Sequence, residues 1–303
     1  MKRGIKLLFL LFVLVLLNPL KELTAQTIPM RVRFGYYAYN LEGKYYSSAL
    51  SSMKSWIESI QMHSGHKLFA NSIVDAKIYS SENDLYSEIY NKTVQVMNLT
   101  SWDYLRLNLK EYLTPLLVSS LMPDSKFEKY CLIVHSDSGI HDLNGLSSFV
   151  VEIPKTNSSK LIRSWLTVEL IEILGRNKYG SVHLEDTSRD ENQSILSVFF
   201  KKNDAAVVRE GAYLIAGELN PQIRKKTSVI ASSPNLINYF LAVQNDMNRQ
   251  YCKEVTDESL NLPLTIEGKQ ILSLMKTEKI YELNEDDFHD TEKLFNRFNK
   301  LFK

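Results

Sequence analysis

A run of small polar residues, Thr156-Asn157-Ser158-Ser159, stands directly before a segment whose apolar residues have helical spacing. Hydroxyl groups and the free backbone N–H groups at a helix N-terminus together suit an anion, and the helix dipole aids them. The alternative is ordinary N-capping, since Ser and Thr cap helices in every class of protein. The run therefore predicts either an anion-binding loop or a plain helix start.

Two further groups of polar residues follow predicted strands. Thr100–Tyr104 (TSWDY) supplies hydroxyls, an indole, a carboxylate and a phenol, a mixed lining that is typical of ligand sites. The alternative is a strand-to-helix turn with Asp103 as the cap and Trp102 in the core. Arg209 follows an apolar strand, and its guanidinium suits a bidentate contact with a phosphate-like or carboxylate group. Its alternative is a solvated surface pair with Glu210.

Motifs for metal binding and covalent catalysis are missing from the sequence. His63 and His66 are three residues apart in a polar turn, but no Cys or third His stands nearby at zinc-like spacing. The sequence has no G-x-S-x-G, no P-loop and no H-E-x-x-H motif. Ser51-Ser52-Met53-Lys54 matches S-x-x-K, but the Lys-Thr-Gly companion of that motif is absent. We therefore expect no metal, no cofactor and no catalytic residue.

The charge balance excludes one class of partner. The chain has 36 Lys and Arg against 35 Asp and Glu, a formal charge of +1. A general nucleic-acid binder normally has a clear basic excess, so we expect no nucleic-acid partner. The length of 303 residues predicts roughly two domains, at about 150 residues each.

Residues 1–26 have the pattern of a secretory signal peptide. Lys2, Arg3 and Lys6 precede eleven unbroken apolar residues, and a small residue, Ala25, stands at a plausible cleavage point. Eleven helical residues cover roughly 16 Å, about half of the hydrocarbon layer, so a permanent span is disfavoured. We expect cleavage after Ala25 or Gln26 and a periplasmic or extracytoplasmic product; an uncleaved anchor is the alternative.

The two cysteines leave their pairing open. In an oxidising compartment Cys131 and Cys252 are able to form a disulfide. Cys131 stands inside an apolar run, YCLIVHS, where a free buried thiol is the alternative.

Helical and alternating patterns follow one another along the chain and predict an α/β protein. The predicted strands are 32–39, 73–79, 94–99, 116–121, 130–135, 149–153, 204–208, 229–233 and 237–243. The predicted helices are 45–61, 81–90, 160–174, 193–200, 265–275 and 286–302.

Open α/β sheets bind ligands beyond the carboxyl ends of their strands. Applied to two facing lobes, this rule selects side chains at one cleft. They are Tyr36, Tyr37, Thr100–Tyr104, Thr156–Ser159 and Val208–Glu210.

The order of these segments resembles a known family. NLTSWDYL, KYCLIVHSDSGIHDLNGL, FVVEIPKTNSSKLIRSWL, NDAAVVREGAY, VIASSPNLINYFLAV and LTIEGKQILSLM follow one another as in type 2 periplasmic binding proteins. Within that class the sequence is similar to the phosphate/phosphite/phosphonate-binding branch of ABC importer solute receptors. The resemblance covers about residues 30 to 300. It implies two α/β lobes that close on a ligand in the cleft between them.

The resemblance also assigns site residues one by one. The family's aromatic after the first strand corresponds to Tyr36 or Tyr37, and the Tyr of its Gly-Pro-x-Ser-Tyr-like loop to Tyr104. Its phosphonate-holding serine loop is similar to Thr156–Ser159. The resemblance implies this ligand-binding set: Tyr36, Tyr37, Ser101, Tyr104, Thr156, Asn157, Ser158, Ser159 and Arg209.

Several positions depart from the family pattern. Thr100-Ser101 stands where Gly-Pro is usual, and Lys160 replaces a Gly after the serine loop. The Ser-His that usually opens the next helix is missing, and Val208-Arg209 stands where an acidic residue is expected. An aminoalkyl phosphonate, whose ammonium needs a carboxylate, is therefore a less favoured ligand.

We expect a monomeric exported solute-binding protein that captures a small anionic ligand, such as a phosphorus oxyanion, for an ABC transporter permease. Lobe one is predicted from 27–122 and 236–303, lobe two from 123–235, with the hinge near Leu121 and Ser233. Two alternatives are a ligand sensor that docks on a membrane receptor kinase and an exported enzyme that uses Cys131.

Overall fold

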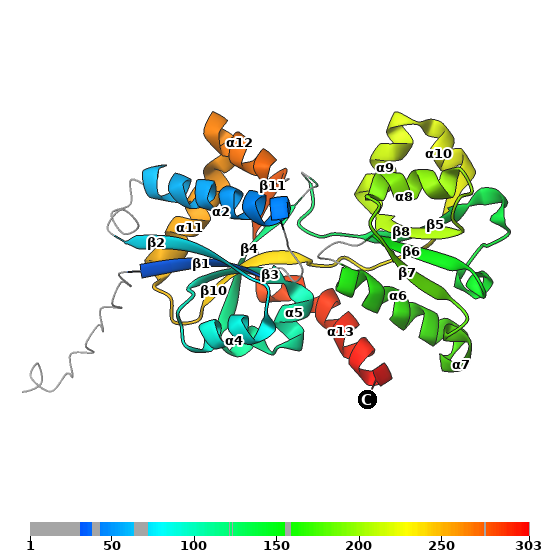
Figure 1. Ribbon diagram of the computed structural model, residues 1–303, viewed down its shortest axis with the longest axis horizontal. Coiled ribbons are helices and arrows are strands. Elements are labelled where there is room, and N and C mark those ends of the chain that lie inside the picture. Colours follow the sequence, from blue (N-terminus) through cyan, green and yellow to red (C-terminus); the bar gives the residue numbers. More distant parts are fainter. Residues whose placement is uncertain are drawn as a thin grey trace, which may run out of the picture.

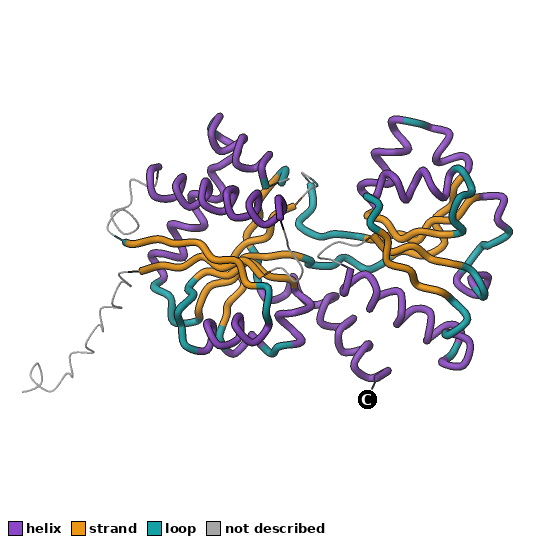
Figure 2. The backbone as a smooth tube through the Cα atoms, in the orientation of Figure 1, coloured by secondary structure: helices purple, strands orange, loops and turns teal. Residues whose placement is uncertain are grey.

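The computed structural model describes residues 31–37, 43–63, 72–120, 122, 124–154, 159–275 and 277–302, and it omits the side chains of 43–46 and 63. Within these ranges two sheets lie along the long axis of the molecule, each between layers of helices (Figures 1 and 2). The predicted α/β class and two-lobed fold are confirmed. The predicted signal peptide lies outside the described residues.

Lobe one contains a six-stranded sheet. In spatial order its strands are β11 (Lys279–Glu282), β4 (Leu113–Ser120), β10 (Tyr239–Gln244), β3 (Val96–Thr100), β1 (Arg31–Tyr37) and β2 (Ile73–Tyr79). β1 pairs in parallel with both β2 and β3, whereas β10 is antiparallel to β3 and β4, and β11 is antiparallel to β4.

Lobe two repeats the same five-strand plan without the extra edge strand. Its order is β7 (His183–Thr187), β6 (Val150–Pro154), β8 (Ala205–Arg209), β5 (Tyr130–His135) and β9 (Thr227–Ser232). β6 is parallel to β7 and β8, and β5 is antiparallel to β8 and β9. The antiparallel strand of each sheet directly follows a linker between the lobes, so the chain crosses between them twice.

Helices cover both faces of each sheet because both faces of the strands are apolar. In lobe one, α2 (Gly43–His63), α11 (Arg249–Asn261) and α12 (Ile266–Leu274) share a core with Val32 and Phe34 of β1. On the opposite face, α4 (Glu82–Tyr90) and α5 (Ser101–Arg106) share a core with Tyr37 and Leu99.

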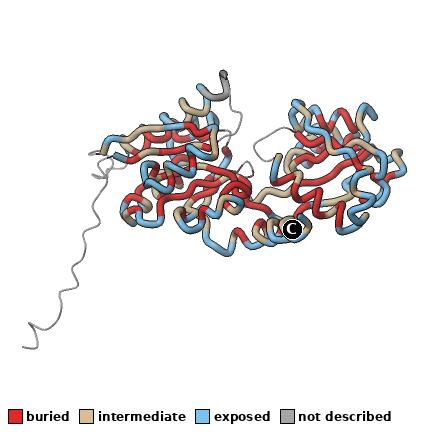
Figure 3. The backbone as a smooth tube through the Cα atoms, turned by 60° about the horizontal axis from the view of Figure 1, so that its bottom comes forward, coloured by how far each residue is buried: buried red, intermediate tan, exposed pale blue. Residues whose placement is uncertain are grey.

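Lobe two has the same layers. The helix α6 (Ser159–Leu174) packs on one face of its sheet, beside the short α7 (Arg176–Tyr179). The other face carries α8 (Glu191–Phe199), α9 (Glu210–Leu219) and α10 (Pro221–Lys226). Single 3-10 turns stand at Leu109–Glu111, Ser136–Ser138, Leu143–Leu146, Leu262–Leu264 and Glu285–Phe288. Buried residues concentrate in the strands, and exposed residues on the outer faces of the helices (Figure 3).

The last helix, α13 (His289–Phe302), contacts both lobes. Its Phe295 and Phe298 each pack edge-on against Trp102 of α5, with ring centroids 5.2 Å apart. Its Arg297 pairs with Glu169 and Glu172 of α6, at 3.0 and 2.5 Å. The predicted lobe boundaries place all of 236–303 in lobe one, and they stay a prediction. In the structure α13 lies between α5 and α6.

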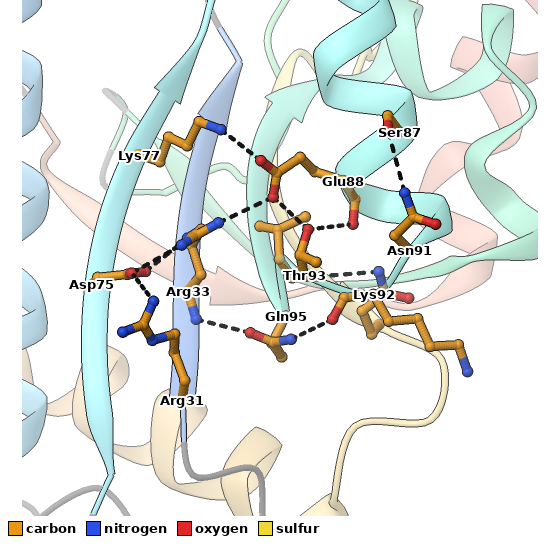
Figure 4. A network of polar contacts seen from close by, with 12 residues as sticks. Arg31, Arg33, Asp75, Lys77, Ser87, Glu88, Asn91, Lys92, Thr93 and Gln95 are labelled. Carbon is orange, nitrogen blue, oxygen red and sulfur yellow. Dashed lines mark hydrogen bonds and ion pairs between the residues drawn. The ribbon is translucent and has the colours of Figure 1, made fainter.

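A dense polar network ties three elements of lobe one together (Figure 4). Arg33 of β1 donates from Nε and Nη2 to both carboxylate oxygens of Asp75 on β2, at 2.9 and 3.1 Å, and from Nη1 to Glu88 on α4, at 3.1 Å. Lys77 and Thr93 also donate to Glu88. We call Arg33, Asp75, Lys77, Glu88 and Thr93 the Arg33 network.

Most predicted elements form close to their expected bounds. The strands 73–79 and 130–135 are observed with those bounds, and Ser81 caps α4 by accepting a bond from the Asp84 N–H. The strands β7 and β11 and the helices α7 and α9 to α11 are not among the predicted elements. β7 (HLEDT) is largely exposed at the edge of its sheet, so its residues lack the apolar alternation that marks a buried strand.

Candidate functional site

The strand ends that face the other lobe come from three strands in each sheet. In lobe one the carboxyl ends of β1 and β3 lie beside the amino end of antiparallel β10, because Tyr239 pairs with Thr100. In lobe two the carboxyl ends of parallel β6 and β8 lie beside the amino end of antiparallel β5, because Arg209 pairs with Tyr130. The candidate site is the pair of edges that these strands form.

The structure separates Tyr36 from Tyr37, since successive side chains of a strand point to opposite faces. Tyr36 is half-buried and stacks on Tyr239, with ring centroids 5.8 Å apart and an interplanar angle of 15°. Tyr37 is 1% exposed in the core on the α4 side, and burial together with the charge of Asp103 raises the pKa of its phenol. The Tyr239 hydroxyl donates to the Tyr37 carbonyl at 2.9 Å.

Ser101 and Tyr104 have protein partners in this structure. The Ser101 hydroxyl, fully buried at the start of α5, donates to the carbonyl of Ile237 at 2.5 Å. The Tyr104 hydroxyl donates to the carbonyl of Leu113 at 3.0 Å, and its ring packs edge-on against Phe240. Burial raises the pKa of the Tyr104 phenol. Both side chains hold α5 in place, and their contact with a ligand stays a prediction.

The described part of the serine loop begins at Ser159. Thr156, Asn157 and Ser158 lie outside the described residues. Ser159 opens α6, and its hydroxyl donates to the carbonyl of Pro154 at 2.9 Å, which joins the end of β6 to the start of the helix. The local alternative of a helix-start role is therefore seen for Ser159, while an anion contact stays a prediction.

Arg209 is tightly paired within lobe two. Its Nε and Nη2 donate to one oxygen of Glu191 at 2.7 and 2.5 Å, and its backbone N–H donates to the other oxygen at 2.9 Å. Glu191 opens α8, so the pair links the end of β8 to a neighbouring helix start. A ligand anion near Arg209 would meet a guanidinium already neutralised by a carboxylate, and this reduces its attraction.

The starts of α5 and α6 meet across the lobes. Lys160, in the first turn of α6, places Nζ 3.2 Å from Asp103 Oδ1 on α5 and 4.0 Å from Glu82 on α4. Arg106 of α5 pairs with the same two carboxylates, at 3.0 and 2.5 Å. We call Glu82, Asp103, Arg106 and Lys160 the interlobe ion cluster; it balances two positive and two negative charges.

The two linkers between the lobes pair with each other. Glu128 and Leu236 exchange both backbone hydrogen bonds, at 2.8 and 2.9 Å. The Ser233 N–H donates to the Tyr130 carbonyl at 2.8 Å, and the Ser233 hydroxyl accepts from the Tyr130 N–H at 2.9 Å. The predicted hinge position Leu121 lies outside the described residues, and Ser233 lies in this paired stretch.

Sequence reasoning missed Tyr239 and Glu191. The strand-end rule selects carboxyl ends, but the antiparallel β10 brings its amino end, and with it Tyr239, to the same edge. The antiparallel register of β10 and β3, in which Tyr239 pairs with Thr100, is the signal that identifies this residue. Glu191 stands near the place where the family has its Ser-His, and its pairing with Arg209 requires the folded chain.

Within the described parts of the chain, no three or more His, Cys, Asp or Glu residues gather in a way that would hold a metal ion. Cys131 and Cys252 are both free. Burial raises the pKa of the Cys131 thiol to about 12, with smaller contributions from Glu210 and Glu191, so this sulfur is a poor nucleophile. Among the helices that the structure describes, each is too short or too polar to span a bilayer.

Comparison with known proteins identifies the family. The sequence matches the family described as ABC transporter, phosphonate, periplasmic substrate-binding protein over residues 48–288. No curated protein matches the chain.

Solved structures share the fold. XAC2383 from Xanthomonas citri, solved with chloride and with ATP, is 12% identical, with a TM-score of 0.63; the match covers 89% of this chain and 98% of XAC2383. A binding-protein component of an ABC phosphonate transporter from Pseudomonas aeruginosa is 14% identical, with a TM-score of 0.58 over 89% and 87% of the two chains. PhnD1 from Prochlorococcus marinus, in complex with methylphosphonate, is 14% identical, with a TM-score of 0.57 over 90% and 99%.

The expected type 2 periplasmic binding protein fold is thus confirmed. Because the family match spans most of the described structure, including the whole second sheet, every strand of the first sheet except β1 and the linkers between the lobes, this chain belongs to the periplasmic substrate-binding proteins of phosphonate ABC transporters.

Proposed function

We propose that the protein captures a phosphorus oxyanion, a phosphate or phosphonate, between its lobes and delivers it to the permease of an ABC importer. The observation that carries the proposal is the meeting of α5 and α6 across the lobes, shown by the 3.2 Å contact between Lys160 and Asp103. It brings the start of a 16-residue helix, which carries the positive end of the helix dipole, to the edge where lobe one faces lobe two.

Each predicted residue has a proposed role at this edge. The Ser159 hydroxyl turns from the Pro154 carbonyl to the bound oxyanion and holds it together with the predicted hydroxyls of Thr156 and Ser158 and the N–H groups of α6. The stacked Tyr36 and Tyr239 form the apolar wall of lobe one and cover the substituent of a phosphonate.

The remaining predicted residues act around this set. Arg209 adds a charge-assisted donor, held in place by Glu191. Asn157 supplies a further amide donor in the predicted serine loop. Ser101, Tyr104 and Tyr37 support α5 and the end of β1 from the core.

Two relatives support a ligand that contains phosphorus–oxygen groups. PhnD1 from Prochlorococcus marinus was solved with methylphosphonate, and XAC2383 from Xanthomonas citri with ATP.

The proposed mechanism is lobe closure with no chemical step. Contacts made only when the lobes close shift the population toward the closed state. The high pKa of the Cys131 thiol favours binding over the alternative of catalysis by this residue. The family match favours import over the sensor alternative.

Thermal unfolding of the chain from residue 27 onward tests the ligand class. Methylphosphonate, phosphite and phosphate are the probes, and sulfate and acetate are the controls. A ligand present at 100 times its dissociation constant stabilises the folded protein by about 2.7 kcal/mol, a shift of a few degrees. Melting temperatures that stay unchanged with all three phosphorus anions would overturn the proposed ligand class.

A pair of variants tests the site. Ser159→Ala and Arg209→Met should each weaken binding of the responding anion by about tenfold, the loss of one charge-assisted or well-placed hydrogen bond. Glu191→Gln is the matched control, because it releases the Arg209 guanidinium and should strengthen anion binding. Equal affinities in all of these variants would show that the anion binds elsewhere.

A further inference from the structure

The interlobe ion cluster is built around a fixed carboxylate. The Asp103 side chain is 5% exposed, and its Oδ2 accepts a bond from the Thr100 hydroxyl at 2.7 Å. Thr100 in turn caps α5 by accepting from the Asp103 N–H at 3.0 Å. Asp103 is therefore held in one position before Lys160 approaches it, and little conformational freedom remains to be lost at this end of the pair.

Lys160 is the partner that comes from the other lobe. Its side chain is 43% exposed, and Lys160 directly follows Ser159 at the start of α6. The pair with Asp103 and Glu82 thus joins the proposed anion-holding helix of lobe two directly to α5 and α4 of lobe one.

A second attachment holds α6 farther along its length. Arg297 of α13 pairs with Glu169 and Glu172 of α6, while Phe295 and Phe298 of the same helix pack on Trp102 of α5. The helix α6 is thus connected to α5 twice, directly at its start and through α13 near its end. Rotation of one lobe relative to the other must disturb one of these two attachments. The start is the weaker of the two, because it rests on one partly exposed lysine.

We propose that Lys160 is a positioning residue that sets the resting angle between the lobes, and that it thereby sets the affinity of the cleft. Its ammonium holds the start of α6 against α5 in the ligand-free protein. When the pair is lost, the lobes sample a wider range of angles and a smaller fraction is ready to bind, which raises the apparent dissociation constant. The statement about affinity rests on the proposed function, whereas the statement about the angle does not.

The distance between the lobes is the first measurement. Nitroxide labels at Ser273→Cys on α12 and Gln222→Cys on α10 stand at exposed positions of the two lobes. Figure 1 shows α12 and α10 in different lobes, on the side of the molecule away from α13, so their separation reports on the angle between the lobes. Cys252→Ser removes the more exposed native thiol, and the buried Cys131 stays unlabelled.

Double electron–electron resonance on the ligand-free protein should give a broader or displaced distance distribution for Lys160→Met than for the parent. Lys160→Arg, which can form the same pair, should restore the parent distribution. The matched control is Arg163→Met: this residue lies one turn along the same helix, but it pairs with Asp186 inside lobe two, at 2.6 Å. It should leave the distribution unchanged. Identical distributions for Lys160→Met and Arg163→Met would overturn the proposal.

Affinity for methylphosphonate, measured by calorimetry, is the second readout. Lys160→Met should weaken it by about fivefold, the lower end of typical coupling between a binding site and a conformational change. Asp103→Asn separates positioning from a direct effect of charge on the anion. It breaks the same pair but makes the site more positive, so a positioning role predicts weaker binding and a direct charge effect predicts tighter binding.

The outcomes distinguish a failure of the proposed function from a failure of the positioning role of Lys160. If the parent protein binds no phosphorus anion, the proposed function fails and the distance measurement alone decides the role of Lys160. If the parent binds and Asp103→Asn binds more tightly, Lys160 acts by its charge and the positioning role is wrong.

Discussion

The Arg33 network and the interlobe ion cluster contain the same kinds of charged side chains but have different structural roles. Arg33 is 19% exposed and connects strand to strand and strand to helix inside one lobe. Arg33 and Asp75 are also direct partners in the register of β1 and β2, so the pairing of the strands already places them together. Lys160 and Asp103 belong to different lobes, and no strand register relates them.

This difference indicates how each group of charges responds to motion. A pair placed by strand register is broken only when the sheet unfolds, so it contributes to stability. A pair that depends on the angle between two lobes can break while both lobes stay folded, so it contributes to the choice of conformation. The following predictions test that distinction.

Trp102→Ala should have the largest effect on stability. The indole is 6% exposed, belongs to the core of lobe two although it stands on α5, and packs on α13. Removing a buried indole typically costs about 3–5 kcal/mol in the free energy of unfolding. Urea denaturation measures it, with Phe302→Ala, at an exposed position of α13, as the control. A loss as small as that of the control would show that the junction does not depend on this side chain.

Arg33→Met should cost less, about 2 kcal/mol, because it leaves the partly buried carboxylates of Asp75 and Glu88 without their shared cation. Arg31→Met is the matched control. Arg31 is 59% exposed and lies 3.8 Å from the same Asp75, so its loss should change the free energy of unfolding by about 0.5 kcal/mol or less. Similar losses for both arginines would contradict the structural role of the network.

The Arg33 network also predicts a pH dependence. Burial opposes ionisation of Glu88, but hydrogen bonds from Lys77 and Thr93 and the charges of Lys77 and Arg33 outweigh it and lower its pKa from 4.5 to about 2. The unfolded chain binds a proton first, so this stabilisation is present above pH 4.5 and is lost as the pH falls toward 2.

Urea denaturation between pH 6 and pH 2.5 measures the effect of Glu88. The parent should lose stability more steeply over this range than Glu88→Gln, which lacks the titrating group. Parallel stability curves for the two proteins would mean that Glu88 does not titrate as the structure implies.

Lys160→Met should have the smallest effect on unfolding, within about 0.5 kcal/mol, because its pair is partly exposed and joins lobes that fold around separate sheets. The interlobe distances should nevertheless change, as described above. A loss of stability as large as that of Arg33→Met would remove the distinction between the two groups of charges.

Local patterns in the sequence were sufficient for most of the fold. The helix after Ser81 and the strands 73–79 and 130–135 follow from capping and apolar spacing, which depend only on neighbouring residues. The edge strands β7 and β11 could not be predicted in this way, since an edge strand need not have a buried face along its whole length.

The candidate site was predictable in part. The strand-end rule selected Tyr36, Ser159 and Arg209, which lie at the facing edges of the two sheets. It also selected Tyr37, whose side chain is buried on the other face of the sheet, and a contact of Tyr37 with a ligand stays a prediction. Tyr239 was missed, because its place at the same edge depends on the direction of β10.

The sequence by itself determined the α/β class, the family and the type of residues at the strand ends, because these depend on composition, periodicity and the order of motifs. Only the tertiary structure decided which charges are paired. Glu191 neutralises Arg209, and Asp103 receives Lys160 from the other lobe. Ion pairs form between groups within a few ångströms of each other, and only the packing of the two lobes brings together groups that are far apart in the chain.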